Sequence, residues 1–427
     1  MISDQTTPDT YYTRTTSRVP QYLALTGAVE ADVCIIGGGL AGLNTALGLI
    51  ERGMNPVVLE SHRVGFGASG RNGGFVLRGF DAGEFNLPGL PLAQRVRMMK
   101  SGTDAQKLIR QRIRDFGIDC QVIDGSLAVT WGRDVRSLQA DVEESNRLFD
   151  FGLEFWSRAH VQEHCKTDLY HGGVFSRDDF HFHPLRYTQG IAAAIAAKGG
   201  RIYESTKASA PQKSGADWVV ATPQGSVRAR HVVVCTSAYG PGFDRRLDLV
   251  TFPVQTYVMV TKPLDPDDLA QTINTPFCVY DLRFACDYYR VLPDRRIMWG
   301  GRAGLNKQPR DISRLMLEDM FRVYPKLRGR VEADISWDGL QSYTPYRMPV
   351  LGQRADGYWY NTAFAGHGMA PTTIGGEIIA SAIAEGQQGY RDYTRYMNMF
   401  TGGPLGPYVA MGLYNIWRLW DWWRFRV

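Results

Sequence analysis

The chain has 427 residues, 44% hydrophobic and 21% charged, and its 48 Lys and Arg against 43 Asp and Glu leave a formal net charge of +5. This composition is typical of a folded globular protein and excludes a disordered or fibrous chain. The charge is too small and too scattered for a nucleic-acid-binding stripe. The length predicts two domains, because single cores rarely grow beyond about 250–300 residues.

The N-terminal 20 residues are polar and rich in threonine, without the basic and then apolar order of a secretory signal. Six cysteines show no C-x-x-C pairing. Both features predict a reducing, cytoplasmic environment. His181 and His183 are two residues apart, which on a strand would place both on one face. Without cysteine or further histidine nearby, we expect ordinary polar residues and no metal site.

The next segment has the order of a dinucleotide-binding unit. An apolar run over residues 31–36 predicts a strand, and a glycine turn follows it at once. Residues 43–52 have a helical pattern, and a second apolar run over residues 56–59 ends in Glu60. Strand, glycine turn, helix, strand and terminal acid together predict a Rossmann-type unit.

Each glycine of this turn has a physical role. Gly37 permits the tight turn, Gly39 lets the backbone approach a pyrophosphate, and Gly42 lets the helix pack on the strand. The N–H groups at the helix N-terminus would bind the phosphates. Glu60 can accept hydrogen bonds from an adenosine ribose and would repel a 2′-phosphate, which favours FAD or NAD over NADP.

The loop over residues 64–75 decides between these cofactors. It places five glycines among small polar side chains. Such a loop lets backbone N–H groups come close to the polar edge of a flat ring system. A nicotinamide enzyme has no need of it, so the loop predicts FAD.

The remaining pattern predicts interleaved domains. Helices are expected over residues 92–116, 135–151, 187–198 and 372–385, a hairpin over 218–228, and strands over 232–238, 252–262, 287–302 and 359–363. We therefore expect an α/β fold in which a Rossmann-type FAD-binding domain (residues 1–90, 181–245 and 341–400) is interleaved with a mixed-sheet α+β substrate domain (residues 91–180 and 246–340). A C-terminal aromatic helix follows in residues 401–427. The N-terminus of the helix at residue 372 would face the cofactor and stabilise the negative charge of a reduced flavin.

The tail, residues 408–427, holds four of the ten tryptophans: Trp417, Trp420, Trp422 and Trp423. At helical spacing its apolar residues form one stripe, with arginines nearby (stripe: Val409, Leu413, Ile416, Trp420, Trp423 and Val427; arginines: Arg418, Arg424 and Arg426). The segment is too short and too polar to span a bilayer. Two alternatives stay open. Either the tryptophans dock the helix on the protein's own surface or on a second subunit, which we favour, or the helix lies peripherally on the inner face of a membrane.

The loop over residues 64–75 resembles the flavin-contacting loop of the D-amino-acid-oxidase-like family of FAD enzymes. Within that family the chain most resembles the γ-glutamylputrescine oxidoreductase branch, which is similar to glycine and sarcosine oxidases. The matching segments keep their order over nearly the whole chain (Tyr11–Tyr12, residues 182–185, 287–290, 300–301, 347–349, 364–369, 402–403 and 410–412).

The resemblance implies an FAD-dependent amine oxidoreductase. In such enzymes a hydride passes from the carbon beside an amine nitrogen to flavin N5, the imine hydrolyses, and O2 is reduced to H2O2 or a quinone takes the electrons. The implied substrate is a γ-glutamylputrescine-like polyamine derivative. The alternative is an imino or secondary amino acid of the proline, pipecolate or sarcosine type. A non-catalytic FAD-bound assembly protein is the alternative of another class, and the intact glycine loops disfavour it.

Sarcosine oxidase-type enzymes hold the flavin through a cysteine near the position of Gly339 in this chain. No cysteine follows Cys286. The resemblance therefore implies non-covalent FAD.

The resemblance also suggests site residues. FAD contacts are expected from the two glycine loops, the strand-end acid, one downstream residue and the Gly-His-Gly turn (Gly37, Gly39, Leu40, Ala41, Gly42, Glu60, Ser61, Gly67, Ala68, Ser69, Arg71, Asn72, Gly73, Gly74, Ala208, Gly366, His367, Gly368 and Met369). Candidate catalytic residues are Arg71, His367, Tyr288, Tyr289 and Arg302. Arg71 either contacts the flavin or only anchors its loop, and His367 either acts in the site or only donates to a carbonyl. Of the adjacent Tyr288 and Tyr289, only one can face the cavity. Arg302 pairs with either a substrate carboxylate or a surface acid.

Overall fold

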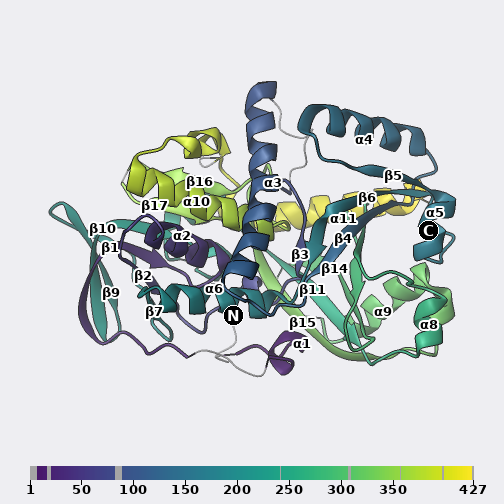
Figure 1. The fold of residues 1–427 in the computed structure, drawn as a ribbon, viewed down its shortest axis with the longest axis horizontal. Coiled ribbons are helices and arrows are strands. Elements are labelled where there is room, and N and C mark those ends of the chain that lie inside the picture. The colour runs from purple at the N-terminus through teal and green to yellow at the C-terminus, as the bar shows by residue number, and fades with distance from the viewer. Residues whose placement is uncertain are drawn as a thin grey trace.

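The computed structural model describes residues 7–16, 21–81, 89–240, 242–305, 309–355, 357–396 and 399–425. Two sheets lie side by side, the first on the left of Figure 1 and the second on the right. The long helix α3 (Leu92–Asp115) stands between them in this view. In the described part of the chain, no helix is long and apolar enough to cross a membrane.

The first sheet has eight strands in the order β16-β17-β10-β1-β2-β7, with β9 and β8 extending from β10. Its bounds are β1 (Gly27–Ile36), β2 (Pro56–Leu59), β7 (Arg201–Tyr203), β8 (Gln212–Ser214), β9 (Asp217–Thr222), β10 (Gly225–Val234), β16 (Val350–Gln353) and β17 (Trp359–Thr362). β1 pairs in parallel with both β2 and β10. The C-terminal ends of these strands, residues 33–36, 57–59 and 232–234, are buried without interruption, and there they consist of Val, Ile, Leu and Cys.

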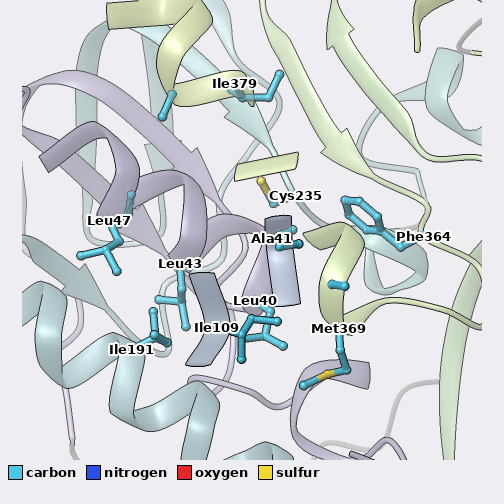
Figure 2. Packing of buried hydrophobic residues seen from close by; sticks show 14 of the residues in the cluster. Leu40, Ala41, Leu43, Leu47, Ile109, Ile191, Cys235, Phe364, Met369 and Ile379 are labelled. Carbon is cyan, nitrogen blue, oxygen red and sulfur yellow. The ribbon is translucent and has the colours of Figure 1, made fainter. Parts of the chain in front are cut away.

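Helices cover the first sheet and create its main core. These are α2 (Leu40–Ile50), α6 (Pro184–Ala197), α10 (Met369–Glu385) and α3. α10 packs on both α2 and α3, and α2 also packs on α6. Figure 2 shows leucines of α2 beside Ile109 of α3 and Ile191 of α6, and Ile379 of α10 belongs to the same core.

The second sheet has nine strands in the order β15-β11-β14-β13-β12-β4-β6-β3, with β5 beside β6. Its bounds are β3 (Phe75–Val76), β4 (Ile123–Thr130), β5 (Glu154–Ser157), β6 (Gly172–His181), β11 (Phe252–Thr261), β12 (Cys278–Asp281), β13 (Tyr288–Val291), β14 (Ile297–Gly304) and β15 (Ala333–Tyr343). A second core around Trp299 joins this sheet to α9 (Ile312–Val323). The other helices are α1 (Tyr11–Arg14), α4 (Val135–Phe149), α5 (Arg158–His164), α7 (Arg245–Val250), α8 (Pro266–Ala270) and α11 (Gly406–Phe425).

Two details differ from the expected division of the chain. β3 follows the glycine loop directly and pairs with β6 of the second sheet, although residues 1–90 were assigned to the FAD-binding domain. α3, assigned to the substrate domain, packs on α10 beside the first sheet. The domain limits themselves stay predictions. The glycine loop therefore bridges the two sheets, and this connection positions the candidate site.

The expectation that His181 and His183 share a strand face is wrong. β6 ends at His181, and His183 caps α6, where its Nδ1 accepts the N–H of Arg186 at 3.3 Å. Pro184 begins the helix because proline suits its first turn. Burial and the charge of Arg290 lower the pKa of His181 to about 3. Its Nδ1 accepts from Arg290 at 2.8 Å and its Nε2–H donates to the Pro276 carbonyl at 2.9 Å, so the ring is structural and neutral.

Candidate functional site

The glycine turn after β1 has the geometry that a dinucleotide requires. Gly37 has φ +117°, a conformation that side chains rarely adopt. A Cβ at Gly42 would lie 2.0 Å from the Gly37 carbonyl oxygen, so the α2 helix packs on this turn without room for a methyl group. Both positions require glycine for the reasons predicted from the spacing.

The second glycine loop contacts the N-terminus of α2. Gly39 is the N-cap and offers no side-chain hydrogen bond. The Leu40 N–H donates to Ser69 Oγ at 2.9 Å, and a Cβ at Gly39 would lie 2.9 Å from the same oxygen. Ala41 and Gly42 continue this first turn, whose N–H groups and positive dipole could hold an anion.

Glu60 stands at the end of β2, opposite the glycine turn. Its Oε2 accepts the Gly38 N–H at 2.7 Å and its Oε1 accepts the His62 N–H at 2.9 Å. Burial raises the pKa of this carboxyl group, while the hydrogen bonds from His62 and Gly38 lower it. Ser61 Oγ lies 3.4 Å from Oε1. Ala208 is half-buried beyond β7, at the edge of the apolar cluster that lines this end of the sheet.

Hydrogen bonds from two of its own side chains hold the second glycine loop in place. Arg71 donates through Nε to the Phe66 carbonyl at 2.9 Å and through Nη1 to the Asp338 carbonyl of β15 at 3.2 Å. The anchoring role is therefore the one that the geometry shows for Arg71. Asn72 donates to the Ala68 carbonyl at 2.9 Å and accepts the Gly74 N–H at 2.7 Å.

The loop presses closely against the second sheet. A Cβ at Gly74 would lie 2.1 Å from the Phe182 carbonyl oxygen, and one at Gly73 would lie 2.8 Å from the ring of Tyr288. Gly67, at the other end of the loop, packs on Tyr239. At these three positions the loop therefore presents backbone, rather than side chains, to its neighbours.

The two adjacent tyrosines of β13 face opposite sides of the sheet. Tyr288 lies over Gly73 and Gly300, on the side of the glycine loop. Tyr289 is fully buried, stacks on Trp299 with ring centroids 4.5 Å apart, and hydrogen-bonds to Tyr170 at 3.0 Å. Tyr289 is thus a core residue, and only Tyr288 belongs to the candidate site.

Arg302 lies away from the loop. It is the extra residue of a β-bulge between β14 and β11 and has φ +53°. The bulge redirects its side chain to Asp319 of α9, where Nη2 donates to Oδ1 at 2.8 Å. α9 packs on the face that carries Tyr289, so the structure pairs Arg302 with an acid of the protein.

Replacing Arg302 by alanine should therefore destabilise the protein without affecting chemistry. We expect the free energy of unfolding to fall by about 2–3 kcal/mol, because a largely buried Asp319 loses its partner, while amine-dependent flavin reduction changes less than about twofold. Denaturant unfolding and stopped-flow absorbance measure the two effects. The double variant Arg302→Met, Asp319→Leu should recover most of the stability, and a large loss of flavin reduction in a stable variant would return Arg302 to the site.

A strained turn precedes α10. Ala363 and Ala365 have φ +61° and +53°. Non-glycine residues adopt such angles at a cost in free energy, and residues strained in this way cluster at functional sites. His367 Nε2 is buried and has no hydrogen-bond partner among the described residues. Gly368 caps α10 without a side-chain hydrogen bond, and Met369 begins the helix. This N-terminus thus presents the positive end of the helix dipole without a side-chain cap.

Three residues that the sequence did not single out as site residues meet this turn. Asp81 Oδ1 lies 3.2 Å, and Tyr343 Oη 3.0 Å, from the position of a Cβ at Gly366. Arg347, with φ +57°, places Nε 3.6 Å from Asp81 Oδ2. Burial raises the pKa of Asp81, and the charges of Arg347 and His367 oppose this shift. Arg347 lies two residues before Pro349 in a segment that resembles the family, whereas Asp81 carries no sequence signal.

One further cluster was also missed. His160, Glu163 and His164 of α5 bring potential metal-ligand atoms within 4.8 Å of one another. The H-x-x-E-H spacing could have revealed it. Both imidazole rings stack on Trp156, at 4.0 and 4.9 Å, so aromatic packing accounts for their arrangement.

Comparisons with known proteins identify a family and similar folds for this chain. The family model for FAD dependent oxidoreductases (DAO) matches residues 32–382. Gamma-glutamylputrescine oxidoreductase of Escherichia coli (strain K12) is 32% identical over 414 residues, which are 94% of this chain and 96% of that protein. Glycine oxidase from Geobacillus kaustophilus has a TM-score of 0.73 at 17% identity, covering 87% of this chain and 99% of that one. L-Proline dehydrogenase from P. horikoshii has a TM-score of 0.71 at 18% identity, covering 91% and 99%.

Proposed function

This chain belongs to the FAD dependent oxidoreductase (DAO) family, and from that premise we propose that it oxidises a C–N bond of an amine whose far end carries an amino-acid group, as in γ-glutamylputrescine. The family resemblance, the α/β fold and the FAD cofactor predicted from the sequence are confirmed. Substrate and residue roles are the proposal.

The glycine-lined cradle suits FAD. We assign the pyrophosphate to the α2 N-terminus at Gly37–Gly42, the adenosine to Glu60, Ser61 and Ala208, and the ring to residues 67–74 and 366–369. Backbone edges at Gly73 and Gly74 and the partnerless Nε2 of His367 support this assignment. FAD, when bound, supplies the acceptor for a hydride from the carbon beside the reacting nitrogen. The chain offers no cysteine beyond Cys286, which supports non-covalent binding.

The pairing of Asp81 with Arg347 beside the Gly366–His367 turn is the observation that carries the substrate assignment. A carboxylate and a guanidinium 3.6 Å apart match the ammonium and carboxylate of an amino-acid end group. The positive dipole at the N-terminus of α10 disfavours an ammonium group nearby. The reacting amine beside this helix end would therefore be held in its neutral form, which is the form that donates a hydride. A substrate with two nitrogens satisfies both environments.

The overall reaction then balances. The amine loses a hydride and a proton to become an imine, and water hydrolyses the imine to an aldehyde and ammonia. The electrons pass to O2, giving H2O2, or to a quinone. An imino or secondary amino acid is the second candidate, because Arg347 alone could bind its carboxylate.

A substrate panel tests the proposal. We expect kcat/KM for γ-glutamylputrescine to exceed that for N-acetylputrescine by roughly 100-fold, since the acetyl compound lacks both end charges. Sarcosine and proline should be poorer still. Flavin reduction fastest with proline or sarcosine would instead establish the second candidate, and no reduction by any amine would reject amine oxidation.

A further inference from the structure

The tail helix α11 docks on the protein through its more polar face. This helix, yellow in Figure 1, lies against the second sheet. Asp421 is buried, and its Oδ2 accepts the Ala285 N–H at 3.1 Å. Tyr414 meets Phe284 with ring centroids 6.2 Å apart, and Phe425 packs against the second core. Docking therefore occurs as expected, but the apolar stripe does not provide it.

The apolar stripe points away from the body. Successive residues of a helix turn by about 100° about its axis. This rotation places the stripe residues 409, 413, 416, 420 and 423 on the side of the helix opposite the docked residues 414, 421 and 425. Their exposed fractions are large (Val409 61%, Leu413 51%, Ile416 61%, Trp420 41% and Trp423 70%). Leu419 and Trp422 widen the exposed surface at 67% and 63%. Contiguous exposed apolar surface of this kind marks a binding face.

The charges of α11 indicate what that face binds. Its charged residues are Arg418, Asp421 and Arg424, and the only acid is turned inward. The Arg424 guanidinium lies 4.9 Å from the centre of the Trp420 ring, at the edge of the stripe. Arg418 lies on the docked side, beside Tyr414 and Asp421. Outward, the helix therefore presents tryptophan, aliphatic side chains and the Arg424 guanidinium, without a negative charge. A two-fold contact between two such faces would bring no acid to this cation, whereas anionic lipid headgroups complement it.

We propose that α11 binds an anionic membrane surface, lying in the plane of the interface with its stripe in the acyl boundary and Arg424 among the headgroups. The helix stays docked through Asp421 and Tyr414 while it does so, because the two faces are opposite. The proposal concerns a surface distant in sequence from both glycine loops and does not depend on the substrate.

Vesicle binding of the full-length holoprotein tests it. Wild type should cosediment with phosphatidylcholine vesicles containing phosphatidylglycerol and not with phosphatidylcholine alone, with a blue shift of tryptophan emission. Trp420→Gln, Trp423→Gln should weaken partitioning by about tenfold or more, because both indoles enter the interface. Arg424→Gln should weaken it by about fivefold. Leu23→Gln, at an 86% exposed site outside the tail, is the matched control and should bind as wild type.

Flavin reduction and melting temperature should be unchanged in the double tryptophan variant, because both side chains face outward. Equal vesicle binding by wild type and that variant would overturn the proposal. So would a wild-type dimer that the variant splits, without vesicle binding, since the stripe would then be a subunit contact.

Discussion

Replacing Gly39 by valine should give a folded protein that no longer retains FAD. Gly39 is the N-cap of α2, at the point where the backbone must approach the pyrophosphate. We expect FAD affinity to fall by roughly 100-fold or more, measured as flavin content after gel filtration and by titration of the apoprotein. Circular dichroism should remain that of wild type, because the nearest atom to the new Cβ is a movable serine oxygen.

A second variant separates two causes of this loss. The added Cβ would lie 2.9 Å from Ser69 Oγ, so valine could act by displacing the second glycine loop instead of meeting the cofactor. In Gly39→Val, Ser69→Ala that contact is removed. Continued loss of FAD is expected from the pyrophosphate assignment, and recovery of stoichiometric FAD would contradict it. Ser69→Ala alone should keep FAD.

Replacing Asp81 by asparagine should raise KM for γ-glutamylputrescine by roughly 30- to 100-fold with a much smaller change in kcat. The reason is that asparagine keeps the shape of the side chain but cannot balance the distal ammonium. N-Acetylputrescine is the control substrate, since it has no such ammonium, and its kinetics should be nearly unchanged. Arg347→Gln should give the complementary loss for the carboxylate. Equal losses with both substrates would mean that Asp81 only shapes the turn.

The pH dependence gives this prediction a second readout. Burial raises the pKa of Asp81 above the ordinary value of 3.8. Because ammonium binding needs the ionised carboxylate, kcat/KM should rise with pH through that raised pKa, and this rise should vanish in Asp81→Asn.

The contribution of Asp81 to the free energy of unfolding has the opposite pH dependence. The folded protein holds the proton more tightly, so this group favours folding below 3.8 and loses that contribution as pH rises through its folded pKa.

The local parts of the site could be predicted from sequence because spacing alone determines them. Gly37, Gly42 and Glu60 occupy one strand–turn–helix–strand unit, and the structure places them as their spacing requires. Strand alternation predicts that only one of Tyr288 and Tyr289 faces the site. The packing on Trp299 then shows that Tyr289 is the core residue.

Long-range arrangements could not be predicted in this way. Asp81 and Arg347 are far apart in sequence and meet only because the chain crosses between the sheets. The β-bulge that turns Arg302 toward Asp319 leaves no pattern in the residues. The tail's stripe lies on one face of α11 from Val409 to Trp423, while its last predicted member, Val427, is outside the described residues. An apolar stripe usually faces the body, and here a buried Asp421 takes that place.

Anaerobic addition of γ-glutamylputrescine to the purified yellow protein tests the central claim most directly. One equivalent should bleach the flavin absorbance and yield one aldehyde and one ammonia per FAD, and acid precipitation should then release all the flavin into the supernatant. A flavin that stays oxidised with γ-glutamylputrescine, yet bleaches with sarcosine, proline or a 2-hydroxy acid, would contradict the account.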